Sequence, residues 1–237
     1  MHGEWTSPTR PFSFPVAREP DNRGCSIRFE PSDAGSFIEK PSAGDHVLFL
    51  SDDVAQTYDA LEAFLRNAIA RDDLVAVAVP GEEMQGLTDL LERRPLGVDP
   101  LTVYSKLVLV DVETWMPGGP SDHETIHSLL EVLASRATEE GRPGLSVVER
   151  IGAVCAERGD VPLCEHVERD IHEGRGAARI LCPYNVPSIS EEGLRAAHDL
   201  PRSHTSAVAT MGAGGRIERL GPSEIRLRSK IRAVPTS

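Results

Sequence analysis

Two uninterrupted apolar runs, Val47–Leu50 (VLFL) and Leu74–Val79 (LVAVAV), decide the fold of this chain. Short apolar runs without polar alternation are typical of strands that are covered on both faces of a sheet. Between the two runs, apolar residues recur at helical spacing over residues 54–69, and Asp52 or Asp53 can cap that helix. The stretch therefore predicts a strand-helix-strand unit, which is the building block of a parallel sheet.

The same alternation of strand and helix patterns continues along the chain. Further strands are predicted at Leu107–Val110, Leu145–Val148, Ala178–Cys182 and, at a sheet edge, Thr205–Thr210. Further helices are predicted after Pro80-Gly81, over Ser121–Glu140 and Cys164–Glu173, and near Ser190–His198. We therefore predict an α/β protein with three layers, α/β/α, around a mostly parallel sheet.

Three segments differ in composition. Residues 1–40 are interrupted by prolines but hold many of the aromatic side chains, so they form either an irregular leader or an arm that docks on the domain or a partner. Residues 41–211 carry the regular pattern and form the domain. Residues 212–237 are glycine-rich and then basic, and they form a solvated tail or a short contact arm, in which Gly221-Pro222 could close a hairpin.

The charge balance excludes some partners. The chain has 25 basic and 37 acidic residues, a net charge of −12, so its surface repels nucleic-acid phosphates and anionic membranes. No apolar run is long enough for a membrane span, and the N-terminus lacks the apolar region of a secretory signal. We expect a cytoplasmic protein with reduced thiols at Cys25, Cys155, Cys164 and Cys182.

The loop after the first strand argues against nucleotide hydrolysis. A phosphate-binding loop needs glycines that let backbone N–H groups approach the phosphates, and often a lysine. Residues 51–57 read SDDVAQT, with two carboxylates and neither glycine nor lysine. We predict that this phosphate loop is degenerate and that the protein uses no cofactor. The glycines of residues 212–215 are not followed by a helical pattern and are a weak substitute.

An alternative function is zinc-dependent hydrolysis. Residues 123–127 read HETIH, which matches the pattern that places two zinc ligands, His123 and His127, beside the general base Glu124. Glu149 is a candidate third ligand. Against this reading, the residues from Ser121 to Glu124 also form a capping box, and no further histidine follows at the spacing of the extended motif. A pair of histidines at a helix edge without metal is the favoured interpretation.

Candidate ligand residues lie next to the predicted strands, because ligands of parallel sheets bind beyond the carboxyl ends of the strands. His46 precedes the first strand, and it either makes a structural hydrogen bond or lines the pocket. Trp115 lies on a loop where it either packs or covers a ligand. The predicted ligand-binding set is His46, Ser51, Asp52, Asp111, Glu113, Trp115, Glu149 and Tyr184, with Asp53 and Asn185 at the same strand ends.

The cysteines offer a possible reactive set as well. A nucleophile pair of Cys182 with His166 is conceivable, but Cys182 ends an apolar strand. Thiols in the core, or at its boundary, are the better interpretation for Cys155, Cys164 and Cys182.

Several stretches, taken in order, resemble a known family. They are Gly44–Leu50 (GDHVLFL), Tyr58–Leu65 (YDALEAFL), Asp73–Val79 (DLVAVAV), Leu107–Asp111 (LVLVD), the Pro117-Gly118-Gly119 loop and Leu181–Asn185 (LCPYN). Their order resembles the MEDS domain, the sensory domain of methanogen and methylotroph regulators such as the dichloromethane dehalogenase repressor, over about residues 41–211. The family is similar to RecA/KaiC-type ATPases in fold but lacks their phosphate loop.

The resemblance implies a non-catalytic input domain for signal transduction or transcriptional regulation, proposed to sense small hydrocarbon derivatives. Only the positions His46, Asp111 and Tyr184 carry over from the family motifs. The chain departs from the family at two places. Leu50-Ser51-Asp52 stands where family members usually have an aromatic residue after the first strand, and Gly144–Arg150 differs from their usual fourth strand, which begins with glycine. We thus expect a sensor for a small molecule or a regulatory protein partner, with a zinc hydrolase and an adaptor as the competing hypotheses.

Overall fold

One sheet organises the described part of the chain. The computed structural model describes residues 38, 40–93, 105–112, 123–186, 200–211 and 216–220. Within them, the strands are β1 (His46–Ser51), β2 (Leu74–Val79), β3 (Leu107–Asp111), β4 (Leu145–Glu149), β5 (Arg179–Asn185), β6 (Ser206–Met211) and β7 (Arg216–Leu220). Their order is β3-β2-β4-β5-β1-β6-β7, and every neighbouring pair is parallel except β6 and β7.

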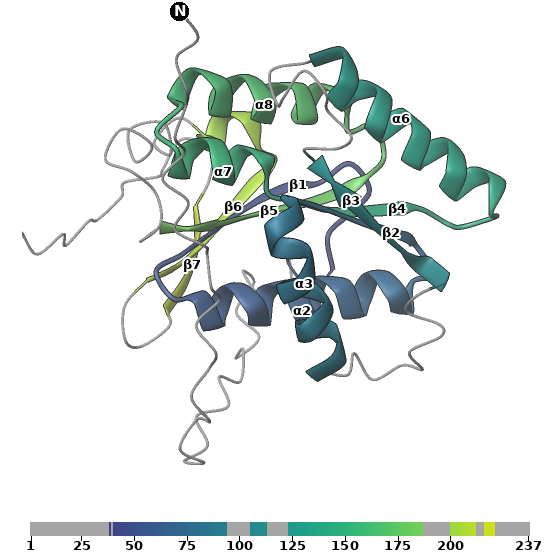
Figure 1. The fold of residues 1–237 in the computed structure, drawn as a ribbon, viewed down its shortest axis with the longest axis horizontal. Coiled ribbons are helices and arrows are strands. Elements are labelled where there is room, and N and C mark those ends of the chain that lie inside the picture. Colours follow the sequence, from purple (N-terminus) through teal and green to yellow (C-terminus); the bar gives the residue numbers. More distant parts are fainter. Residues whose placement is uncertain are drawn as a thin grey trace, which may run out of the picture.

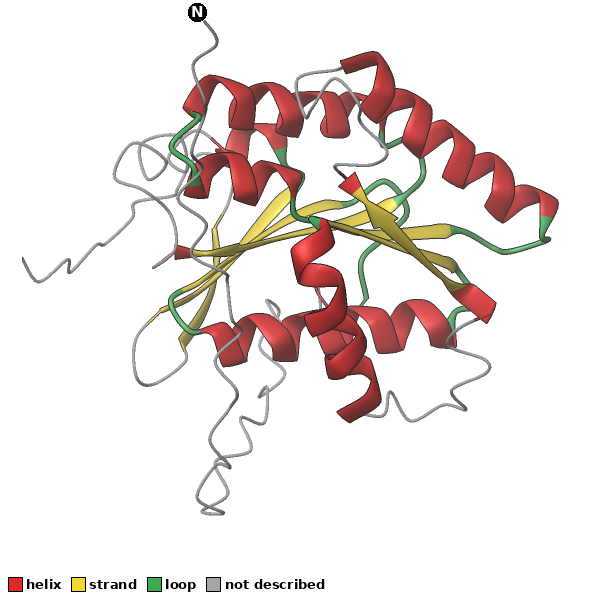
Figure 2. Cartoon of the chain, in the orientation of Figure 1, coloured by secondary structure: helices red, strands yellow, loops and turns green. Residues whose placement is uncertain are grey.

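Helices cover both faces of this sheet (Figure 1; Figure 2). One face carries α2 (Val54–Ala70) and α3 (Gly81–Arg93), and the other carries α6 (His123–Glu139), α7 (Ile151–Glu157) and α8 (Val161–Gly174). The chain moves outward from β1 through β2 to β3 and then returns through β4 to β5. Because crossovers between parallel strands are right-handed, this reversal moves the later helices to the opposite face. The predicted three-layer α/β/α fold is confirmed.

Two apolar layers explain the uninterrupted runs in the sequence. Successive side chains of a strand point to opposite faces of the sheet. In β1, Leu48 and Leu50 belong to the core beneath α6, α7 and α8, whereas Val47 and Phe49 belong to the core beneath α2. Both faces are covered, so every residue of β1 and β2 is buried. The edge strand β3 is less buried.

Most predicted elements are confirmed, with three differences. The fifth strand is longer than predicted, so Tyr184 and Asn185 lie inside β5 rather than after it. β6 is not an edge strand, because β7 pairs with it antiparallel. β7 lies within the segment expected to be a tail. It pairs with β6, which precedes it in the chain, and not with a strand after the turn expected at Gly221-Pro222. The helix predicted near Ser190–His198 and residues 1–37 lie outside the described residues.

None of the described helices is both long enough and apolar enough to cross a membrane.

The cap of α2 can be tested by substitution. The Asp53 carboxylate accepts a hydrogen bond from the Ala55 N–H at 2.8 Å, which satisfies one free donor at the start of the helix. Asp53→Ala should lower the free energy of unfolding by about 1 kcal/mol in urea titrations. Asp52→Ala is the matched control one residue before the cap. Equal losses in the two variants would contradict the assigned cap.

Candidate functional site

The loop between β1 and α2, where a phosphate-binding loop would lie, is held by hydrogen bonds among its own residues. The Ser51 hydroxyl donates to the Asp53 carbonyl at 2.8 Å and accepts from the Asp53 N–H at 3.1 Å. The Asp53 carboxylate then occupies the N-terminus of α2, where the helix dipole would otherwise favour a phosphate. The prediction of a degenerate phosphate loop is confirmed in this geometry.

The predicted ligand residues do not gather at one sheet edge. Ser51 is buried at the end of β1, and Asp52 is exposed beside it. Asp111 ends the edge strand β3, next to Gly81, and β2, β4 and β5 separate it from β1. Glu113 and Trp115 lie outside the described residues. The other three members, His46, Glu149 and Tyr184, are buried inside the sandwich.

A cluster of buried polar side chains lies between the sheet and α8. We call His46, Glu168, Cys182 and His204 the interior cluster; all four are at most 4% exposed. His46 begins β1, Cys182 lies in β5 opposite Leu48, and Glu168 comes from α8. His204 follows the short 3-10 helix η2 (Leu200–Ser203), just before β6. Four segments of the chain thus contribute one polar group each.

The two histidines of this cluster have fixed orientations. The Nδ1 atoms of His46 and His204 lie 2.8 Å from the Ser203 carbonyl and 2.6 Å from the Leu200 carbonyl. Because a carbonyl oxygen only accepts, each Nδ1 carries a proton, and the two Nε2 atoms are turned into the interior cluster. The rings are stacked with centroids 4.0 Å apart. Burial and the neighbouring His204 lower the pKa of His46 to about 4, so His46 is neutral at neutral pH.

Glu168 is the acid of the interior cluster. Its Oε1 accepts a hydrogen bond from the Tyr184 hydroxyl. Its Oε2 lies 3.4 Å from Nε2 of His46 and 3.1 Å from Nε2 of His204. Burial alone would raise the pKa of Glu168, but the imidazoles of His204 and His46 outweigh burial and hold that pKa below its usual range.

The thiols of this region are not poised as nucleophiles. Sγ of Cys182 lies 3.0 Å from Nε2 of His46, and burial raises the pKa of the Cys182 thiol well above its ordinary value. His166 lies on the outer side of α8, where it pairs with Asp170 at 3.2 Å. The pairing of Cys182 with His166 is therefore wrong, because His46 is the imidazole beside this thiol. Cys155, Cys164 and Cys182 are buried free thiols, as the sequence indicated.

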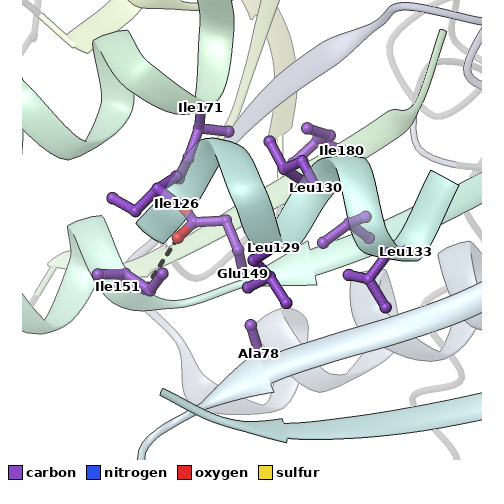
Figure 3. A pocket seen from close by; sticks show the side chains of 10 residues that line it. Ala78, Ile126, Leu129, Leu130, Leu133, Glu149, Ile151, Ile171 and Ile180 are labelled. Atoms are coloured by element: carbon purple, nitrogen blue, oxygen red, sulfur yellow. Dashed lines mark hydrogen bonds between the residues drawn. The ribbon is translucent and has the colours of Figure 1, made fainter. Parts of the chain in front are cut away.

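A small cavity lies beside the interior cluster, between α6 and the sheet (Figure 3). Its volume is about 20 Å³. Nine apolar residues and Glu149 line it: Ala78, Ile126, Leu129, Leu130, Leu133, Val147, Ile151, Ile171, Ile180 and Glu149. The surface that they present to the cavity is apolar, so Glu149 contributes carbon atoms rather than its carboxyl oxygens.

Glu149 is an unusual carboxyl in this setting. Its Oε2 accepts from the Ile151 N–H at 2.9 Å, whereas its Oε1 is buried without a hydrogen-bond partner. Burial and the negative charge of Glu168 raise the pKa of Glu149 to about 8, so the group is largely protonated at neutral pH. The carboxyl also lies next to the Cys182 thiol. Glu149 thus borders both the cavity and the interior cluster.

The HETIH segment contributes mainly apolar surface to this region. Ile126 points into the cavity with the leucines of α6, and the His127 ring lies against Gly174 of α8. Among the side chains that the structure describes, one group brings three or more possible metal ligands together. That group is the interior cluster, and it contains neither His127 nor Glu149. The side chains of His123 and Glu124 lie outside the description, so the zinc-hydrolase alternative stays a prediction.

Sequence reasoning missed two members of the interior cluster. Glu168 carried a usable signal, because it falls on the buried stripe of α8 formed by Cys164, Val167 and Ile171. A carboxylate in such a stripe must have partners. His204 carried no comparable signal, because only the fold brings it to the start of β1.

Comparisons with known proteins support the architecture. A family model described as MEDS, the methanogen/methylotroph, DcmR sensory domain, matches residues 45–204. Among solved structures, an uncharacterized protein from Pyrococcus horikoshii, solved in complex with an unknown peptide, has a TM-score of 0.50 and 14% identity over 74% of this chain and 82% of that one. No curated protein matches the chain.

Two further solved structures have named roles. The flagellar accessory protein FlaH from Methanocaldococcus jannaschii has a TM-score of 0.46 and 11% identity over 82% of this chain and 84% of that one. The ATP synthase subunit NeqB from Nanoarcheaum equitans has a TM-score of 0.49 and 11% identity over 75% of this chain and 48% of that one. The chain thus spans about half the length of NeqB. At 14% identity, the likeness to the Pyrococcus horikoshii protein concerns the fold alone.

The packing of the Glu168–Tyr184 pair against α7 can be tested at Gly152. A methyl group at Gly152 would overlap Glu168 Oε1 and the Tyr184 hydroxyl oxygen, neither of which has room to move. Gly152→Ala should lower the free energy of unfolding by about 1–3 kcal/mol. The matched control, Gly174→Ala, meets only the His127 ring at 3.1–3.3 Å and should change stability by less than about 1 kcal/mol. Equal effects in denaturant titrations would contradict this placement.

Proposed function

The chain belongs to the MEDS family of sensory domains, and from this premise we propose that it is a non-catalytic sensory module that binds a small, largely apolar ligand within its α/β sandwich. The ligand site in this proposal is the cavity between α6 and the sheet. The observation that carries the proposal is the apolar cavity itself, which Glu149 borders through its carbon atoms while Oε1 of its carboxyl is buried close by without a hydrogen-bond partner. Buried polar atoms in native proteins normally have partners, so this atom indicates a missing one.

The chemistry of the lining defines the class of ligand. A cavity of about 20 Å³ holds one water-sized group, so a ligand of several heavy atoms must displace the surrounding leucine and isoleucine side chains. After these side chains move, the protonated carboxyl of Glu149 can turn to the ligand and donate one hydrogen bond to an oxygen or a halogen. This supports a small hydrocarbon derivative, such as a halogenated methane or a short alcohol, as the ligand of the proposed sensor.

The absence of catalysis in the proposal rests on two further observations. The carboxylate of Asp53 occupies the helix terminus that would bind the phosphates of a nucleotide. The buried thiols of Cys155 and Cys182 have raised pKa values, about 12 for Cys155, which disfavours the nucleophilic thiolate. Both features support binding without turnover. In the proposal, the response then passes to a regulatory protein partner.

Dichloromethane is a suitable probe for the cavity. Addition of dichloromethane at about ten times its dissociation constant should stabilise the protein by about 1.4 kcal/mol in thermal unfolding. Ala78→Val fills the cavity from β2 and should weaken this binding at least about tenfold. The matched control, Ala134→Val, changes an exposed position of α6 and should keep the response.

Methyl NMR spectra give a second readout. Shifts induced by dichloromethane should be largest at Leu129, Leu130 and Leu133, which line the cavity. The proposal is overturned if none of dichloromethane, methanol and chloromethane binds the unsubstituted protein. It is also overturned if a folded Ala78→Val variant binds them unchanged.

Nucleotide assays test the non-catalytic part. Millimolar ATP with magnesium should produce no stabilisation and no hydrolysis, because Asp53 repels phosphate at the start of α2. ATP turnover that changes in the Asp53→Ala variant but not in the Asp45→Ala control would refute the assignment as a non-catalytic module. Asp45 is the matched control because its carboxylate accepts from the Ser42 N–H, at the opposite end of β1.

A further inference from the structure

We propose that the interior cluster, His46, Glu168, Cys182 and His204, binds one divalent transition-metal ion of the zinc class. The proposal goes beyond the cavity as a ligand site and does not depend on it. The four side chains offer two imidazole nitrogens, one carboxylate oxygen and one sulfur, a donor set that suits zinc and its neighbours rather than magnesium or calcium.

The spacing of the donor atoms fits a tetrahedral ion. All four donor atoms lie within 4.8 Å of one another. Nε2 of His46 lies 3.0 Å from Cys182 Sγ and 3.4 Å from Glu168 Oε2, and Nε2 of His204 lies 3.1 Å from the same Oε2. Zinc bonds of about 2.0–2.3 Å in a tetrahedron separate the donors by roughly 3.3–3.8 Å. An ion therefore fits with small outward movements of the side chains.

Two buried polar atoms face each other at the centre of the interior cluster. Oε2 of Glu168 and Nε2 of His204 lie 3.1 Å apart, yet neither has a hydrogen-bond partner. His204 donates through Nδ1 to the Leu200 carbonyl, which turns its Nε2 toward the carboxylate of Glu168. A cation between the two atoms would give both of them a partner. A proton on Nε2 of His204 is the competing explanation, because it would make the two atoms an ion pair, and the metal analysis below distinguishes the two.

The outer partners of the donors are those of a metal site. Metal-ligating histidines usually donate their other ring N–H to a carbonyl or carboxylate, which fixes the ring and its tautomer. His46 and His204 both do so, to Ser203 and Leu200. The remaining carboxylate oxygen of Glu168 accepts from the Tyr184 hydroxyl. Each of these three ligands is therefore held in place by a group that is not itself a ligand.

The charges of the site would balance. A divalent ion bound by the Glu168 carboxylate and the Cys182 thiolate gives zero net charge with two neutral imidazoles. Burial favours such a neutral group over an isolated carboxylate. The thiol must lose its proton when the metal–sulfur bond forms, so binding releases one proton to solvent.

The number of protein ligands defines the role of the ion. Four protein ligands leave no open position for water or substrate, which is typical of structural zinc sites rather than hydrolytic ones. The ligands come from β1, β5, α8 and the turn before β6, so the ion would tie one helical layer to the centre of the sheet. We infer a structural ion that stabilises the folded domain.

Metal analysis of the full-length protein tests the site directly. Elemental analysis after purification in zinc-containing buffer should give about one zinc per chain, and removal by a chelator should lower the thermal stability. Cobalt substitution should give visible d–d bands and a near-ultraviolet charge-transfer band from the thiolate. X-ray absorption of the zinc form should show one sulfur and three nitrogen or oxygen ligands.

Variants assign the ligands. Cys182→Ser should abolish the thiolate-to-cobalt band, and Glu168→Gln and His204→Gln should lower zinc affinity at least about 100-fold. Matched controls are Cys155→Ser, another buried thiol, and His166→Gln, on the outer side of α8. Both should keep one zinc and the cobalt spectrum. Circular dichroism identifies variants that do not fold. The cobalt spectrum of the unsubstituted protein needs no substitution, so it tests the site even where a variant does not fold.

Three results would overturn the metal site. The first is less than a tenth of an equivalent of zinc or cobalt in the folded, unsubstituted protein. The second is a full equivalent that survives in folded Cys182→Ser and His204→Gln variants. The third is loss of the metal in His127→Gln with retention in Cys182→Ser, which would assign the ion to the HETIH segment instead.

Discussion

The buried carboxylate of Glu168 imposes the conditions that its surroundings meet. A carboxylate that is fully removed from water is strongly unfavourable unless hydrogen bonds or opposite charges compensate it. Here the Tyr184 hydroxyl satisfies one oxygen, and two imidazoles surround the other. The demand extends to the backbone, since α7 can approach this pair only where Gly152 lacks a side chain. A single acid on α8 thus determines residue types on β1, β5, α7 and the turn before β6.

Strand register is what delivers these partners. In the parallel pair of β1 and β5, Leu48 lies opposite Cys182 and His46 lies opposite Ile180. Side chains two residues apart share a face, so His46 and Cys182 meet diagonally beneath α8. A slip of one residue would turn one of them toward α2. The hydrogen bonds of the Thr205 side chain to the backbone of His46 hold the other side of β1, next to His204. The same register that buries the apolar runs therefore assembles the polar interior.

The sequence predicted the layers more completely than the site, for physical reasons. Val47–Leu50 and Leu74–Val79 report local burial directly, and the spacing of residues 54–69 reports a helix, so α/β/α could be derived without knowing any contact. The capping role of Asp53 was also local and is confirmed. The site depends instead on pairs such as His46 with Cys182, which are 136 positions apart. The rule that ligands bind at strand ends led to Asp52 and Asp111, which the strand order keeps apart.

The length of β5 explains where Tyr184 lies and connects the cavity with the interior cluster. Because the strand continues to Asn185, Tyr184 turns inward to Glu168 rather than outward to a ligand at the strand end. The Tyr184 hydroxyl and the Glu168 carboxylate therefore meet between α8 and the sheet, beside the cavity, rather than at the edge of the sheet. Glu149 lies at the boundary, since it lines the cavity and its carboxyl lies beside the Cys182 thiol. In the proposed sensor, a ligand that hydrogen-bonds to Glu149 changes the surroundings of Cys182, and through the interior cluster it acts on α8. A buried chain of contacts of this kind can carry a signal from the cavity to the surface of the helical layer without a catalytic step.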